Sequence, residues 1–120
     1  MIKVLLVDDD RDLLEMVCMM LKTPAIAPVC IDNGGMVMPH VEALVPDVVV
    51  LDIYLGNYDG RNLCKQIKDS KEYADMPVLL YSAGDIKPDS IRDCGADDFL
   101  RKPFEMQELI EKIELLAKQS

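Results

Sequence analysis

Long apolar stretches are absent from this sequence, and none of its apolar runs approaches the roughly 20 residues that a membrane-spanning helix needs. The chain starts MIKVLLVDDD, so acidic residues follow the first apolar run where a signal peptide has small residues before its cleavage site. These two absences argue against membrane insertion and against secretion. We therefore predict a cytoplasmic protein with no membrane partner.

Positive charge is also scarce in this chain. Its 13 lysine and arginine residues face 22 aspartate and glutamate residues, which gives a net charge of −9. Binding to a phosphate backbone is driven by lysine and arginine clusters that release counterions, so an acidic chain is poorly suited to it. We expect no direct nucleic acid binding.

The sequence offers little for a zinc site or a disulfide framework. It has a single histidine, His40, and its four cysteines are at least 12 residues apart, with no Cys-x-x-Cys pair: Cys18, Cys30, Cys64 and Cys94. Cysteines of cytoplasmic proteins are typically reduced. We predict buried thiols rather than disulfides.

The sequence does contain a regular alternation of strand-like and helix-like segments, without a linker, a repeat or a low-complexity tract. Its 120 residues suit one domain, residues 1–120. Apolar runs predict five strands, at residues 2–7, 28–31, 48–51, 78–81 and 98–100. Helical periodicity is clearest at residues 11–22, 61–69 and 105–119.

This alternation favours a parallel sheet with helices on both faces, because parallel neighbours need crossover connections. The first, third and fourth strands are continuously apolar, as central strands covered on both sides are. Pro39 is expected in the first turn of the second helix, near PHVEAL, and Pro88 limits the fourth helix to about DSIRDC. The predicted fold class is α/β, with a single doubly wound sheet of five parallel strands.

Polar residues collect where the predicted strands end. Asp8 and Asp9 follow the first strand, Asp52 the third, Ser82 the fourth and Lys102 the fifth. In a doubly wound sheet, ligands bind at the carboxyl ends of the strands, where the strand order reverses. We therefore predict that these five residues, which we call the strand-end cluster, face one crevice.

Taken singly, members of the cluster have ordinary structural explanations. The acids after the first strand, Asp10 included, could cap the first helix, and Asp52 could begin a turn. The pair Asp59-Gly60 already supplies turn chemistry in this stretch, which leaves Asp52 free for another role. Taken together, carboxylates on two strands with a hydroxyl and a cation on the next two indicate a reactive site.

The chemistry that suits this cluster is phosphoryl transfer. Converging carboxylates repel one another unless a cation lies among them, and Mg²⁺, with Mn²⁺ as an alternative, prefers such oxygen ligands. The ammonium of Lys102 and the hydroxyl of Ser82 are groups that bind phosphoryl oxygens. A carboxylate can itself be the nucleophile and form an aspartyl phosphate, and Asp52 is placed for that role.

With these residues placed, the chain closely resembles the receiver domain of two-component response regulators, the fold of the chemotaxis receiver, over essentially all of its length. The motifs are VLLVDDD for the acidic pair, VVVLDIYLGNYDG for the phosphoacceptor strand, MPVLLYSAG for the hydroxyl strand and GADDFLRKPF for the lysine. Four such motifs in this order and spacing are highly specific. The resemblance implies the flavodoxin-like strand order 2-1-3-4-5.

The resemblance also implies how the acids act. Asp9, Asp52 and the backbone carbonyl of Tyr54 would bind Mg²⁺ directly, and Asp8 would act through water. Asp52 would receive a phosphoryl group from a histidine kinase, a phosphotransfer protein or a small acyl phosphate.

The remaining roles implied by the resemblance concern the response to phosphorylation. Ser82 and Lys102 would bind phosphoryl oxygens, with Ser82 shifting toward them, and Phe99 on the fifth strand would turn inward. These movements would change the surface of the fourth helix, fifth strand and fifth helix by a population shift. The Lys102–Pro103 peptide bond is expected to be cis.

Positions around Asp52 are expected to tune the site. Tyr54 and Gly84 are assigned as modulating residues, and the large ring of Tyr54 is predicted to slow hydrolysis of the aspartyl phosphate. Gly56 stands where the family usually has proline, so the loop after Asp52 is less restrained. Phe99 lacks the hydroxyl of the usual tyrosine.

The expected partners are a histidine kinase or phosphotransfer protein, together with a downstream protein target or an output domain. The sequence leaves open a stand-alone receiver, a piece of a larger regulator or hybrid kinase, and a homodimer. The domain would be a switch rather than a turnover enzyme, although it would catalyse its own phosphorylation and dephosphorylation.

Three other functions fit parts of the pattern. A haloacid-dehalogenase-type phosphatase has an aspartate nucleophile after its first strand, as in Asp8-x-Asp10, but usually needs a longer chain and leaves Asp52 without a role. An FMN carrier shares the sheet, but the acidic DDDRD loop is unsuited to a flavin phosphate. A receiver-like interaction module that is never phosphorylated would not need the complete cluster.

Overall fold

A five-stranded parallel sheet forms the centre of the computed structural model, which describes residues 1–119. Ser120, the last residue of the predicted domain, lies outside the described residues. The strand order is β2-β1-β3-β6-β7, which confirms the predicted α/β fold and the order 2-1-3-4-5. The strands are β1 (Ile2–Val7), β2 (Ile26–Ile31), β3 (Val48–Asp52), β6 (Val78–Ser82) and β7 (Asp98–Arg101).

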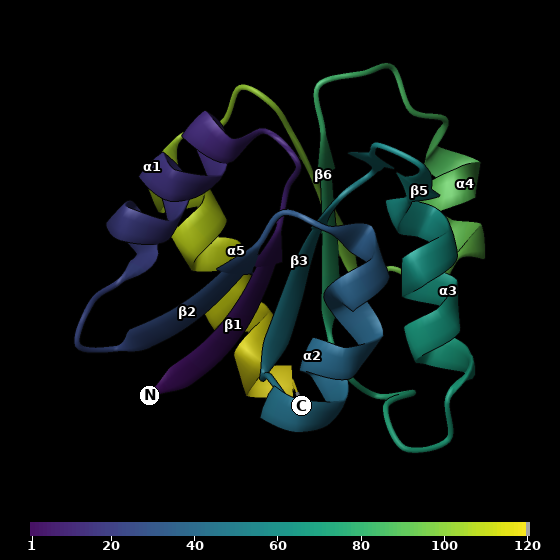
Figure 1. The fold of residues 1–120 in the computed structure, drawn as a ribbon, viewed down its shortest axis with the longest axis horizontal. Coiled ribbons are helices and arrows are strands. Elements are labelled where there is room, and N and C mark those ends of the chain that lie inside the picture. The colour runs from purple at the N-terminus through teal and green to yellow at the C-terminus, as the bar shows by residue number, and fades with distance from the viewer. Residues whose placement is uncertain (120) are drawn as a thin grey trace.

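Helices cover both faces of this sheet (Figure 1). One face carries α1 (Arg11–Leu21) and α5 (Met106–Gln119), and the other carries α2 (Val37–Leu44), α3 (Gly60–Asp69) and α4 (Pro88–Asp93). As predicted, Pro39 lies in the first turn of α2, and Pro88 begins a short α4. None of the helices among residues 1–119 is long and apolar enough to cross a membrane.

The core has two layers, one on each side of the sheet, because successive strand residues point to opposite faces. Leu5, Val49 and Leu80 pack toward α2 and α3, whereas Val4 and Val50 pack toward α1 and α5. Every residue of β3 and β6 is buried, as expected for central parallel strands. Each fully buried valine or leucine contributes about 1.5–3 kcal/mol, so the central strands give rigid support to the residues at their carboxyl ends.

The stretch after β3 forms a small hairpin that the apolar pattern of the sequence does not predict. Strands β4 (Tyr54–Leu55) and β5 (Tyr58–Asp59) pair antiparallel, and Gly56 between them has a φ of 62°, a conformation that favours glycine. The turn therefore belongs to Gly56 and its neighbour, not to Asp59-Gly60 as predicted. Asp59 instead caps α3, accepting a hydrogen bond from the amide of Arg61 (2.8 Å).

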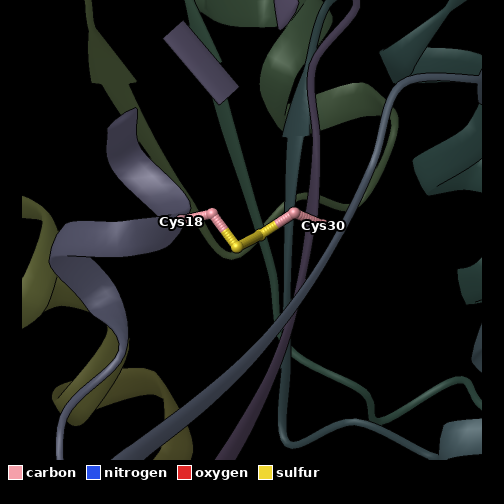
Figure 2. The surroundings of a disulfide bond; sticks show 2 residues. All are labelled: Cys18 and Cys30. Carbon is pink, nitrogen blue, oxygen red and sulfur yellow. A yellow bond between two sulfur atoms is a disulfide. The ribbon is translucent and has the colours of Figure 1, made fainter. Parts of the chain in front are cut away.

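The prediction of four reduced cysteines is wrong for one pair. Cys18 on α1 and Cys30 on β2 form a disulfide, with their Cα atoms 6.3 Å apart (Figure 2). Because α1 packs directly against β2, the two side chains meet across the crossover, which their spacing in the sequence does not reveal. Cys64 and Cys94 are buried free thiols, as predicted, and burial raises the pKa of Cys64.

Candidate functional site

The strand-end cluster assembles at the carboxyl ends of the central strands. Asp8, Asp9 and Asp52 each offer a carboxylate oxygen, and these three atoms lie within 4.8 Å of one another. The Nζ atom of Lys102 reaches between them, 2.9 Å from Asp8 Oδ2 and 3.2 Å from Asp52 Oδ2. Four of the five predicted residues therefore converge on one point.

Ser82, the fifth member, is fully buried at the end of β6. Its Oγ atom accepts a hydrogen bond from the amide of Gly84 (3.2 Å). Its backbone carbonyl accepts a hydrogen bond from the amide of Lys102 (2.9 Å), so the main chains of the two residues are tied together. The Lys102–Pro103 peptide bond is cis, as the sequence resemblance implies.

The three acids differ in their access to water. Asp8 is fully buried and Asp52 is 6% exposed, whereas Asp9 is exposed. A buried carboxylate is costly unless it is hydrogen-bonded or paired with a cation, and Lys102 supplies a cation to both buried acids. Of these three acids, Asp9 is the one that faces solvent.

Asp8 is held by donors on both of its oxygens. Oδ1 accepts the amide of Asp10 (2.9 Å), and Oδ2 accepts Lys102 Nζ (2.9 Å) and the hydroxyl of Tyr81 (2.8 Å). Burial on its own raises the pKa of Asp8, but these hydrogen bonds outweigh it and leave the pKa below its ordinary value. Asp8 is therefore ionised near neutral pH. Asp10 itself caps α1, since its side chain accepts the amide of Leu13 (3.3 Å).

Asp52 is in the opposite electrostatic situation. Burial raises its pKa to about 6, and the neighbouring charge of Asp8 adds to the increase while Lys102 opposes it. Near neutral pH the carboxylate form dominates, but Lys102 only partly balances its negative charge. Such a group gains from any further cation placed beside it.

Two glycines allow the chain to pack closely around Asp52. A side chain at Gly60, the first residue of α3, would collide with the backbone carbonyl of Asp52. A Cβ atom at Gly84 would lie 3.1 Å from the ring of Tyr54, so the two predicted modulating positions are neighbours. Tyr54 is 54% exposed beside the cluster, while Phe99 on β7 is half-buried against the core.

Tyr81 is a residue of this site that the sequence pattern does not indicate. It is fully buried in β6, where the chain reads as an apolar strand. A tyrosine in a buried strand usually finds a hydrogen-bond partner for its hydroxyl, and that requirement was the available signal. The partner could not be named from the sequence because it follows β1, far away along the chain.

The comparison with known proteins decides the family. Residues 4–114 match the model of the response regulator receiver domain. The chain belongs to this family. Receiver domains are signalling switches of two-component systems.

Curated relatives agree with this assignment. The receiver domain is 30% identical to the response regulator MprA of Mycolicibacterium vanbaalenii over 121 residues, which cover 99% of this chain and 52% of that protein. It is 28% identical to the transcriptional regulatory protein BaeR of Escherichia coli O6:H1, covering 97% of this chain and 48% of that protein. The chain thus spans about half the length of these relatives.

Solved structures share the fold over nearly the whole chain. The receiver domain of the Francisella response regulator 1452 superimposes with a TM-score of 0.86 at 29% identity, covering 98% of each chain. The chemotaxis response regulator CheY4 of Vibrio cholerae, at 23% identity, shows the same fold with a TM-score of 0.88 and covers 97% of this chain and 98% of its own.

Proposed function

We propose that this receiver domain, residues 1–120, accepts a phosphoryl group on Asp52 in a Mg²⁺-dependent reaction and relays that event as a change in its own surface. The observation that carries the proposal is the surroundings of Asp52. Its carboxylate lies among the oxygens of Asp8 and Asp9, and Lys102 Nζ is 3.2 Å away. A carboxylate between a cation-binding group of acids and an ammonium is arranged as a phosphoryl acceptor.

The donor set fits Mg²⁺, which takes hard oxygen ligands from one or two carboxylates and keeps several waters; Mn²⁺ is the alternative. Asp9, Asp52 and the backbone carbonyl of Tyr54 would hold the ion directly. Asp8 would act through water, which agrees with its oxygens already accepting three protein donors. When bound, the ion neutralises charge on the acids and on the phosphoryl oxygens.

The transfer step is a displacement at phosphorus. An Asp52 carboxylate oxygen attacks the phosphoryl group of a phosphohistidine or an acyl phosphate, and a new O–P bond forms. The bond to the donor breaks, and its electron pair leaves with the imidazole nitrogen or the acyl oxygen. Lys102 moves from Asp52 to a phosphoryl oxygen, and the Ser82 hydroxyl donates to another.

The switch results from these new contacts. Ser82 turns from its Gly84 contact toward the phosphoryl group, and Phe99 moves inward from its half-buried position. Shifting an equilibrium from 1:99 to 99:1 takes roughly 5.5 kcal/mol of differential interaction. Charge-assisted hydrogen bonds, at about 1.5–3 kcal/mol each, supply that amount and change the surface of α4, β7 and α5.

The partners that suit this function are a histidine kinase or phosphotransfer protein upstream, and a target protein or an output domain on a longer chain downstream. Relatives of about twice this length support an output domain on a longer chain. A homodimer is a further assembly to test. A net charge of −9 supports a domain that does not bind nucleic acid itself. We further propose that it works in the cytoplasm, as a switch rather than a turnover enzyme.

Incubation with acetyl phosphate and Mg²⁺, followed by mass spectrometry of the intact protein, tests the proposal. We expect one phosphoryl adduct that depends on Mg²⁺ and disappears in Asp52→Asn. The absence of an adduct in the parent protein at saturating donor would instead leave an unphosphorylated interaction module.

The same assay separates the enzymatic alternative. Turnover of the donor that survives in Asp52→Asn but is lost in Asp8→Asn would indicate an aspartate-nucleophile phosphatase. The burial of Asp8 and its three donors argue against that outcome, because a nucleophile needs an accessible lone pair. A yellow complex with FMN would indicate a flavin carrier.

A further inference from the structure

Tyr81 links the two groups on which the strand-end cluster depends. Its hydroxyl donates to Asp8 Oδ2 at 2.8 Å, and its ring lies under the Lys102 ammonium, with Nζ 4.4 Å from the ring centroid. The ring is fixed on another side by Phe104, in an edge-to-face contact with centroids 5.9 Å apart. A fully buried side chain with these three contacts has little freedom to move.

The contact with Asp8 restricts what that carboxylate can offer. An ionised carboxylate has about four lone-pair sites, two on each oxygen. Lys102 and Tyr81 fill those of Oδ2, and the amide of Asp10 takes one on Oδ1. The remaining acceptor site is on Oδ1, so the hydroxyl of Tyr81 fixes which oxygen is presented to a water molecule bound to a neighbouring cation.

The contact with Lys102 acts on the other partner of the site. A cation over an aromatic face is stabilised by the ring quadrupole, more strongly where water is excluded. The Lys102 side chain is only 14% exposed. The ammonium of Lys102 therefore contacts the face of the Tyr81 ring and, in addition, the carboxylates of Asp8 and Asp52.

We propose that Tyr81 is a positioning residue of the phosphoryl-acceptor site: through its hydroxyl it orients Asp8 toward the bound Mg²⁺, and through its ring it holds Lys102 in reach of Asp52. This inference rests on the proposed function, because it assigns a role toward the ion and the phosphoryl group. Partners that orient metal-binding side chains in this way typically change metal affinity by 10–100-fold when they are lost.

A simpler explanation is that a buried tyrosine hydroxyl needs an acceptor and that Asp8 happens to be near. That explanation predicts a loss of stability in Tyr81→Phe with unchanged Mg²⁺ affinity. The two explanations therefore differ in the Mg²⁺ affinity that they predict for Tyr81→Phe, a quantity that a loss of stability alone does not change.

The test is a titration of the folded protein with Mg²⁺ alone, monitored by NMR chemical shifts, in the parent, Tyr81→Phe and Tyr73→Phe. Tyr73→Phe makes the same chemical change away from the cluster and is the matched control. We expect the dissociation constant for Mg²⁺ to rise by about tenfold or more in Tyr81→Phe and to stay unchanged in the control. An unchanged or tighter affinity in Tyr81→Phe overturns the proposal.

A double variant tests whether the effect passes through Asp8. In an Asp8→Asn background, Tyr81→Phe should weaken Mg²⁺ binding no further, because the group that it orients is already altered. Full additivity of the two changes would contradict the assignment. Tyr81→Leu extends the test to the ring: at saturating Mg²⁺ we expect slower phosphorylation than in Tyr81→Phe, and equal rates would remove the role assigned to the ring.

These outcomes remain distinct from failure of the proposed function. Mg²⁺ affinity is measured without a phosphodonor, so a parent protein that binds Mg²⁺ but is never phosphorylated would disprove phosphoryl transfer while the Tyr81 comparison still gives its own answer.

Discussion

The strand-end cluster and the α1–β2 edge of the sheet are held together in opposite ways. At the strand ends, two buried carboxylates share the ammonium of Lys102. At the edge, the disulfide between Cys18 and Cys30 ties α1 to β2 covalently. Buried charges are expensive to desolvate, whereas a disulfide stabilises mainly by restricting the unfolded chain.

The difference separates a responsive region from a static one. In a cluster where two buried acids share one cation, the electrostatic interactions between them change when another charged group, such as Mg²⁺ or a phosphoryl group, binds. The disulfide is indifferent to charge and responds only to reductants. We therefore expect changes at the strand ends to affect both function and stability, and changes at the edge to affect stability alone.

The largest effect is expected from removing the shared cation. Lys102→Met should lower the free energy of unfolding by about 3–5 kcal/mol at neutral pH, because it leaves the buried carboxylates of Asp8 and Asp52 without their partner. It should also slow phosphorylation. Denaturation in urea measures the first effect and the acetyl phosphate assay the second.

The matched control is Lys112→Met. Lys112 pairs with Asp98 at 2.9 Å, but both side chains are partly exposed, so its loss should cost less than about 1 kcal/mol. Equal losses of unfolding free energy in Lys102→Met and Lys112→Met would show that the buried ion pairs contribute no more to stability than an exposed one.

The disulfide is predicted to contribute next most, through stability alone. Its two cysteines are 12 residues apart, and closing a loop of about that length stabilises by about 2–4 kcal/mol. Adding reductant should lower the free energy of unfolding by that amount without altering the rate of phosphorylation. A variant with Cys18→Ser and Cys30→Ser should be insensitive to reductant, and a parent protein equally insensitive would contradict this prediction.

In metal-free protein, the pH dependence of the free energy of unfolding should show the cost of keeping Asp52 ionised in the cluster. The pKa of Asp52 is raised to about 6 in the folded state, so between pH 3.8 and about 6 the folded protein binds a proton that the unfolded chain does not. Stability therefore falls as pH rises through this window. Asp8, whose pKa is lowered, contributes in the opposite direction at lower pH, losing its stabilising effect as pH falls.

Unfolding experiments across this pH window, with Asp52→Asn as the reference, isolate the contribution. The difference in unfolding free energy between the two proteins should change between pH 3.8 and about 6 and then level off. A constant difference would show that the Asp52 carboxyl titrates normally in the folded protein.

Tyr54 is expected to have the smallest effect, on the lifetime of the phosphoryl group. Its ring lies beside Gly84 at the edge of the cluster, and we expect it to restrict the approach of water to the phosphoryl group. Tyr54→Ala should speed loss of the phosphoryl group several-fold, as followed by mass spectrometry after the donor is removed. Tyr58→Ala, a comparably exposed tyrosine on the same hairpin, should not. A Tyr54→Ala variant that loses phosphate no faster than the parent would disprove the gating role.

The responsive region could be predicted from the sequence because its logic is local and repeated. Each apolar run predicts a buried strand, and the carboxyl ends of parallel strands meet at one edge. A polar residue one or two positions beyond the end of each run, such as Asp8, Asp52 or Lys102, is therefore placed without knowledge of any pairwise contact.

The features that the sequence does not reveal depend on contacts between segments. The disulfide depends on how α1 is oriented about its axis where it packs on β2, because that orientation places Cys18 against Cys30. The hydrogen bond from Tyr81 to Asp8 joins the ends of strands that are not neighbours in the sheet. The turn at Gly56 depends on a positive φ that the competing Asp59-Gly60 pair concealed.

The most direct test of the central claim uses beryllofluoride, a mimic of the phosphoryl group, with fluorine NMR as the readout. We expect bound fluoride resonances in the parent protein that require Mg²⁺ and vanish in Asp52→Asn. Bound resonances that persist in Asp52→Asn, or their absence from the parent protein at saturating Mg²⁺ and beryllofluoride, would contradict the assignment of Asp52 as the phosphoryl acceptor.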